Sequence, residues 1–274
     1  MSSANATILE KKYKNLVLQV SLTEASFCIK DTLKDSIETI HHYYFDKISN
    51  PTEIEQSLIK FFNETPELNA SFDEITVLHN NNLLTFVPSV LFDAQYLGSY
   101  LQYNTKVFES DFFAYDLVTN NDMVTVYIPY VNINNFLIDR FGSFNYKHSF
   151  TILVKKVLEF SKNIDETQLY VHIQSDNFQI IAAKNQKLLL FNTFDYKTEE
   201  DFIYYLLFVA EQLNLNPETV QLKLFGTVSK ESNLYQVSYK YIRNVSLFFN
   251  HNSIENTISQ EEYLQNFIPL HTCE

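Results

Sequence analysis

The chain has 274 residues and a net charge of −13, and no block rich in lysine or arginine interrupts the acidic excess. A surface of this charge repels phosphate backbones and anionic lipids, which argues against binding to nucleic acid or to a membrane surface. Hydrophobic residues make up 46% of the chain and charged residues 19%, which is a globular composition. At about 100 to 200 residues per domain, the length favours two lobes.

Cysteine usage and the N-terminal residues indicate a reduced, cytoplasmic compartment. Two cysteines, Cys28 and Cys273, are too few for a disulfide framework or a zinc site. Cys28 stands between Phe27 and Ile29, so we interpret it as a small buried hydrophobe and not as a nucleophile. No apolar run reaches the length of a membrane-spanning helix, and residues 1–6 lack the apolar core of a signal peptide. We expect no direct insertion into a membrane.

The first part of the chain predicts a three-stranded meander followed by a helix. Residues 1–12 are polar and are expected to form a flexible tail. Short apolar runs at 16–21, 27–30 and 37–45 are separated by polar breaks, which is typical of antiparallel strands. Asn50 suits an N-cap and Pro51 a first helical position. The apolar spacing after Pro51 predicts a helix.

The middle of the chain predicts two hairpins and alternating helices and strands. Strands are expected at 75–79 and 83–87, and a helix is expected from Pro88 to Leu101. A second hairpin at 112–118 and 123–128 would turn through Thr119, Asn120, Asn121 and Asp122. A helix at 132–141, a strand at 143–148 and a helix at 150–161 follow, with Gly142 placed to end the first helix.

A second meander is expected between 168 and 194, with strands at 169–173, 178–183 and 187–194. Thr198 and Asp201 have the spacing of a capping box, and the apolar residues that follow recur on one helical face up to Leu213. The remaining chain predicts a strand at 220–225, a helix capped by Ser229 or Ser232, a strand at 245–249 and a closing helix at 259–270.

The two meander-helix units run in register: Leu16 corresponds to Leu169, and Phe27 corresponds to Phe178. We interpret this as an internal duplication, since repetition of this kind constrains the whole fold. The alternative is an accidental likeness, because three strands and a helix are a common order.

Two such units, each followed by alternating helix and strand, resemble the actin-like ATPase architecture of actin, Hsp70 and sugar kinases. The segment 123–161 looks like the pilus-assembly and cell-division branch, and the whole sequence looks most similar to a family of uncharacterised bacterial proteins with a divergent actin-like fold. The resemblance implies an α/β fold with mixed sheets in two lobes. In this actin-like fold, a ribonuclease H-like unit is duplicated. We expect the first lobe at 13–163 with an inserted region at about 80–120, the second at 164–258, and a C-terminal helix at 259–274 that returns to the first lobe.

In this superfamily, two turns rich in glycine and acid hold the nucleotide phosphates. The corresponding turns here, 20–25 and 174–177, contain no glycine. The candidate nucleotide-binding residues are therefore few: Ser21, Thr23, Asp176, Gly226 and Thr227, the last two at the place of the adenosine motif. A hairpin aspartate such as Asp176 more often serves its turn. No catalytic residue and no metal site are predicted.

Two functions remain open from the sequence. The first is a non-catalytic actin-like scaffold or protein-interaction module with a degenerate nucleotide site and no cofactor. The second is a divergent ATPase that uses ATP and magnesium. The resemblance implies another protein as partner, since pilus-assembly members dock a peptide of a membrane-associated protein. The aromatic segment 96–115, with Tyr96, Tyr100 and Tyr103, is the candidate surface; alternatively, these rings fill the seam between the lobes.

Overall fold

The computed structural model describes residues 11–45, 54–118, 122–249 and 258–273. Most of the expected tail, the expected caps Asn50 and Pro51, and the turn residues Thr119, Asn120 and Asn121 lie outside these ranges. Within them, no helix is both long and apolar enough to cross a membrane.

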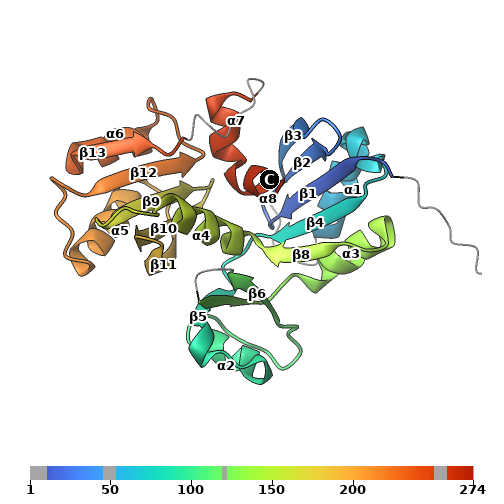
Figure 1. Cartoon of the computed structure of the whole chain (residues 1–274), viewed down its shortest axis with the longest axis horizontal. Coiled ribbons are helices and arrows are strands. Elements are labelled where there is room, and N and C mark those ends of the chain that lie inside the picture. The colour runs from blue at the N-terminus through green and yellow to red at the C-terminus, as the bar shows by residue number, and fades with distance from the viewer. Residues whose placement is uncertain (1–10, 46–53, 119–121, 250–257, 274) are drawn as a thin grey trace, which may run out of the picture.

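Two five-stranded sheets dominate the molecule and share one strand order (Figure 1). The first has the order β3-β2-β1-β4-β8, formed by β1 (Lys14–Val20), β2 (Glu24–Asp31), β3 (Ser36–Tyr44), β4 (Glu74–His79) and β8 (Asn145–His148). The second has the order β11-β10-β9-β12-β13, formed by β9 (Gln168–Ile173), β10 (Asn177–Lys184), β11 (Lys187–Asp195), β12 (Gln221–Gly226) and β13 (Asn244–Leu247). In each sheet the meander is antiparallel, and the two strands that follow pair in parallel.

A third, smaller sheet has the order β5-β7-β6, formed by β5 (Leu84–Pro88), β6 (Ala114–Val118) and β7 (Met123–Tyr127). It carries α2 (Leu97–Leu101) and lies below the two lobes in Figure 1. We call this part, residues 84–127, the small unit.

The continuous helix predicted from Pro88 to Leu101 is wrong. Only α2 is an α-helix there, preceded by 3₁₀ turns at Ser89–Leu91 and Ala94–Tyr96. The Asp93 side chain accepts a hydrogen bond from the Gln95 N–H at 2.9 Å, and such local bonding competes with a helix.

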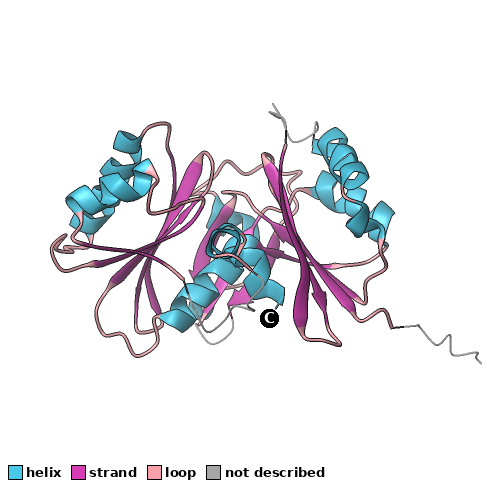
Figure 2. Ribbon diagram, turned by 90° about the horizontal axis from the view of Figure 1, so that it is seen from above, coloured by secondary structure: helices cyan, strands magenta, loops and turns pink. Residues whose placement is uncertain are grey.

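Helices cover the outer faces of both sheets and fill the space between them (Figure 2). The outer helices are α1 (Ile54–Glu64) and α3 (Val131–Phe141) on the first sheet and α5 (Glu199–Gln212) and α6 (Asn233–Tyr241) on the second. The central helices are α4 (Ser149–Phe160), α7 (Gln260–Gln265) and α8 (Phe267–Cys273). A short 3₁₀ helix, η2 (Pro66–Asn69), follows α1.

The central strands read as continuous apolar runs because both of their faces are buried. Successive side chains point to opposite faces of a strand. Leu16 and Leu18 therefore pack under α1 and α3, while Val17 belongs to the central layer. The same division holds in the second sheet, where Leu169 and Val171 pack with α5 and Tyr170 faces the centre.

The predicted capping chemistry is found at the C-terminus of α3, where Gly142 is the C-cap, and at the start of α5, while the C-terminal segment differs from the prediction. The capping box of Thr198 and Asp201 at α5 is confirmed. The predicted closing helix is divided at Asn266 into α7 and α8. Pro269 is the third residue of α8 and lacks the N–H that would bond the carbonyl of Gln265, which favours a break between the two helices. The C-terminal α8 contacts β1, β2 and α4.

Candidate functional site

The turns that follow β1 and β9 meet at one cavity of about 270 Å³ between the two sheets. The first turn contributes Ser21, Leu22, Thr23 and Glu24, the second contributes Gln174, Asp176 and Asn177, and the other lining residues are Asn80, Asn81, Asn82 and Tyr130. Three sequence candidates, Ser21, Thr23 and Asp176, are thus brought together. Gly226 and Thr227 do not line this cavity but lie at the end of β12, next to Ile173.

The first turn is closed by the hydroxyl of Ser21. Its Oγ accepts hydrogen bonds from the N–H groups of Thr23 at 3.1 Å and Glu24 at 3.0 Å. A third bond joins the Ser21 N–H to the Glu24 carbonyl at 2.9 Å. Three N–H groups of this turn, those of Ser21, Thr23 and Glu24, therefore already have an acceptor inside the protein.

The second turn is equally self-contained. The Gln174 N–H donates to the Asn177 carbonyl at 2.9 Å, and the Asn177 side-chain amide donates to the Asp176 carboxylate at 2.7 Å. The Tyr196 hydroxyl donates to the Gln174 carbonyl at 2.8 Å. Asp176 thus takes part in ordinary turn hydrogen bonding, as a hairpin aspartate commonly does.

Glu24, which no sequence motif marks, joins the two turns. Its side chain is buried, and Oε1 accepts from Gln174 Nε2 at 3.3 Å. Its other oxygen lies 3.2 Å from His42 Nε2 on β3. A buried carboxylate therefore stands at the contact between the two turns, one from each sheet. The residue type was visible in the sequence, but its pairing with a residue 150 positions away was not.

The network continues into the second sheet. Gln179 Nε2 donates to Gln174 Oε1 at 3.3 Å, and Gln179 Oε1 lies 2.7 Å from His172 Nδ1. Burial lowers the pKa of His172, while the Gln179 bond and the charge of Glu24 act in the opposite direction. The imidazole is therefore neutral near pH 7 and acts as a structural member of the network.

Gly226 packs within the second sheet, and Thr227 makes a second contact between the two sheets. Gly226 has φ +90°, and the Thr227 N–H donates to the Ile173 carbonyl at 2.8 Å. The Thr227 side chain also hydrogen-bonds Tyr44 at the end of β3. Burial and then the charge of Glu24 raise the pKa of Tyr44, and the bond with Thr227 lowers it.

A buried polar cluster supports the strand ends beside the cavity. His79 Nε2 lies 2.9 Å from Asn134 Oδ1, and Ser149 Oγ donates to Asn80 Oδ1 at 3.1 Å. Burial lowers the pKa of His79 to about 4 and that of His148 to about 3. Both histidines are therefore uncharged at neutral pH. Among the described residues, no group of three or more His, Cys, Asp or Glu side chains could hold a metal ion.

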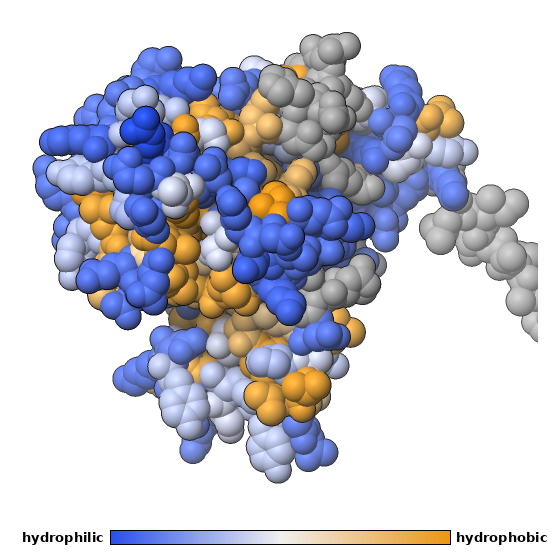
Figure 3. Space-filling view, turned by 60° about the vertical axis from the view of Figure 1, so that its left-hand side comes forward, coloured by the Kyte–Doolittle hydropathy of each residue, from blue (hydrophilic) through white to orange (hydrophobic). Residues whose placement is uncertain are grey.

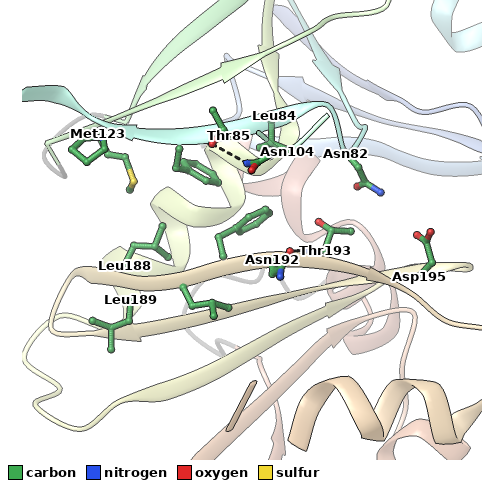
Figure 4. Close-up of a pocket in the computed structure, with 14 residues that line it drawn as sticks. Asn82, Leu84, Thr85, Asn104, Met123, Leu188, Leu189, Asn192, Thr193 and Asp195 are labelled. Carbon is green, nitrogen blue, oxygen red and sulfur yellow. Dashed lines mark hydrogen bonds between the residues drawn. The ribbon is translucent and has the colours of Figure 1, made fainter. Parts of the chain in front are cut away.

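A larger groove of about 670 Å³ separates the small unit from the second sheet. Figure 4 shows Leu84 and Thr85 of β5 on one side and Leu188, Leu189 and Asn192 of β11 on the other. The Phe86 and Phe191 rings meet across it, with centroids 5.0 Å apart. Asp195 is the one acid in its lining. The groove is mixed apolar and amide in character and lacks paired charges for catalysis.

The small unit also carries the candidate partner surface. Tyr103 is 85% exposed and Tyr96 is 58% exposed. Tyr100 is less exposed than either, being partly buried, and its hydroxyl donates to the Leu91 carbonyl at 2.7 Å and accepts from the Asp93 N–H at 2.9 Å. Further exposed apolar side chains on this unit are Val90, Leu91, Phe108, Phe112, Tyr115 and Leu117. Apolar and aromatic groups are visible on its surface at the bottom of Figure 3.

Three solved structures share this fold. A Bacteroides thetaiotaomicron protein with an actin-like ATPase fold and unknown function is 23% identical, with a TM-score of 0.80 over 96% of this chain and 97% of that one. The PilM–PilN type IV pilus biogenesis complex matches at 9% identity, with a TM-score of 0.57 over 94% of this chain and 97% of that one. The ethanolamine utilization protein EutJ from Carboxydothermus hydrogenoformans matches at 8% identity, with a TM-score of 0.50 over 95% and 89%.

These likenesses confirm the predicted α/β, two-lobed actin-like fold and, at such identities, concern the fold alone. No curated protein matches the sequence. Residues 3–245 match a family described as "Protein of unknown function (DUF3822)". Since this match spans most of the 274 residues, the chain belongs to the DUF3822 family.

Proposed function

We propose that this protein is a non-catalytic actin-like scaffold, or protein-interaction module, with a degenerate nucleotide site. The contact between Glu24 and Gln174 is the observation that carries the proposal, because it joins the two turns across the cavity where phosphates bind in actin-like ATPases. We place the first lobe at 13–163 and the second at 164–258. We also propose that the protein acts in the cytoplasm.

Two features of the cavity and one of the neighbouring end of β12 support the loss of nucleotide binding. The N–H groups of Thr23 and Glu24 donate to Ser21 and are not available to a phosphate. The Glu24 carboxylate would repel a phosphate in a partly buried site, where opposition between like charges is costly. Gly226, at the adenosine position, has its free side occupied by the backbone of Ile173. These residues do not fit a nucleotide with magnesium, so no hydrolytic step is assigned to them.

Calorimetry with ATP and magnesium tests this part. We expect no binding heat at millimolar ATP and no phosphate release. A divergent ATPase, the alternative, would give a dissociation constant below about 100 μM, which corresponds to more than about 5.4 kcal/mol, and the binding would be lost in Asp176→Ala. It would also raise the free energy of unfolding by about 2.7 kcal/mol at a ligand concentration a hundred times that constant.

The proposed partner is another protein that binds the exposed aromatic face of the small unit. Exposed tyrosines favour interfaces because they bring a large contact area and lose little rotamer entropy. The fold resembles that found in the PilM–PilN complex. By analogy, the proposed partner is a peptide of a membrane-associated protein. Tyr96 and Tyr103 are the residues assigned to contact it, while the hydroxyl of Tyr100 holds the preceding loop.

Partner capture from native lysate, with mass spectrometry, tests this surface. We expect the double variant Tyr96→Ala, Tyr103→Ala to lose a specific partner that the wild type recovers. Tyr204→Ala on α5 is the matched control, since Tyr204 is a 63% exposed tyrosine on a different surface. Equal recovery by the wild type, the double variant and the control would remove the small unit as the binding site.

A further inference from the structure

The two cysteines of the chain lie against each other. Cys28 stands in the middle of β2 and Cys273 ends α8, and their Sγ atoms are 2.9 Å apart although 245 positions separate them. They are not joined covalently. A disulfide has an S–S distance of about 2.05 Å, so the sulfurs need to approach by less than about 1 Å to bond.

The pair lies where the C-terminal segment crosses between the sheets. Cys28 contributes to the central core and is 0% exposed, whereas Cys273 is 9% exposed. At the other end of α8, the Phe267 ring meets Phe225 on β12 at 4.8 Å and Phe248 at 5.6 Å. One short helix thus contacts the second sheet at its beginning and the first sheet at its end.

We propose that Cys28 and Cys273 form a redox-active pair whose intramolecular disulfide ties α8 to β2, with a small disulfide such as oxidised glutathione as the oxidant. The bond would hold the C-terminal segment across both sheets. It would also close a loop of nearly the whole chain, and cross-links of long loops restrict the unfolded state most.

The reaction proceeds by two thiol–disulfide exchanges. The Cys273 thiol loses its proton to solvent, and its thiolate attacks one sulfur of oxidised glutathione, which forms a mixed disulfide and releases one glutathione thiolate. The Cys28 thiol then loses its proton, and its thiolate attacks Cys273 Sγ and releases the second glutathione. Two electrons pass from the protein thiols to the oxidant. Cys273 reacts first because it alone of the two has exposed surface.

Intact-mass measurement of the purified protein in glutathione redox buffers tests the pair. The wild type should lose about 2 Da in oxidising buffer, with both thiols protected from alkylation under denaturing conditions, and should regain them with a reductant. Cys28→Ser should stop at the mixed disulfide, about 305 Da heavier, because it lacks the second nucleophile. Cys273→Ser should remain unmodified, because Cys28 is buried.

The stability of the oxidised form provides a second readout. The bond should raise the melting temperature of the wild type by about 5–10 °C. The same oxidising buffer should leave the melting temperatures of both serine variants unchanged. A wild type that keeps two alkylatable thiols, or that stops at a glutathione adduct, would overturn the proposal. So would an oxidised form that melts at or below the temperature of the reduced form.

Discussion

Replacing Gly226 with alanine is the sharpest test of how the end of β12 is built. Gly226 has φ +90°, and a Cβ there would lie 2.1 Å from the Ile173 carbonyl oxygen and 2.8 Å from the Ile173 nitrogen. Both are backbone atoms of the neighbouring strand and cannot rotate away. We therefore expect β9 and β12 to separate locally, with loss of the 2.8 Å bond between the Thr227 N–H and Ile173.

Gly142→Ala supplies the matched control. Gly142 also has positive φ, +79°, but a Cβ there would meet nothing within 4 Å. Backbone strain should lower the free energy of unfolding of each variant by about 1–3 kcal/mol. In Gly226→Ala, steric crowding should lower it by about 1–3 kcal/mol more, and the lost hydrogen bond by about 1 kcal/mol. The difference between the two variants is therefore about 2–4 kcal/mol.

Urea unfolding followed by far-ultraviolet circular dichroism measures both free energies. A difference below about 1 kcal/mol between Gly226→Ala and Gly142→Ala would refute the steric argument. Contact with the Ile173 backbone would then not be the reason for a glycine at position 226. Close approach of the backbone to a ligand would be the better explanation. A difference in the expected range assigns Gly226 to packing between strands.

Three further predictions concern the network, pH and helix capping. Glu24→Gln should lower the free energy of unfolding by about 1 kcal/mol in urea titration, because one acceptor oxygen is lost; an unchanged value would contradict a role in joining the lobes. The pKa values of His79 and His148, about 4 and about 3, lie below the usual 6.5, so the unfolded chain binds more protons below about pH 6.5. Stability should therefore fall as the pH falls from about 6.5 toward 4, by up to about 1.4 kcal/mol per pH unit for each histidine; flat urea midpoints between pH 7 and 5 would argue against it. Thr198→Ala should cost about 1 kcal/mol through loss of the α5 cap, and Thr198→Ser should restore most of it.

Local patterns alone determined the order of elements and much of their capping. The alternation of apolar runs and polar breaks placed both meanders, because a strand has a period of two and its turns need polar residues. Thr198 and Asp201 marked the start of α5, since a capping box is a feature of neighbouring residues. That order carried the resemblance to the actin-like fold, which implied the two-lobed architecture. The helix expected from Pro88 failed because Asp93 bonds its own turn, a competition that helical periodicity does not record.

Tertiary structure alone decided which distant side chains meet. Glu24 and Gln174 both follow apolar strands, but nothing in either segment specifies a partner 150 positions away. Cys28 and Cys273 each looked like an isolated buried or terminal residue until β2 and α8 placed their sulfurs 2.9 Å apart. Such contacts depend on how whole sheets and helices pack, since the packing of elements and not the spacing of neighbours sets the distance between residues far apart in the chain.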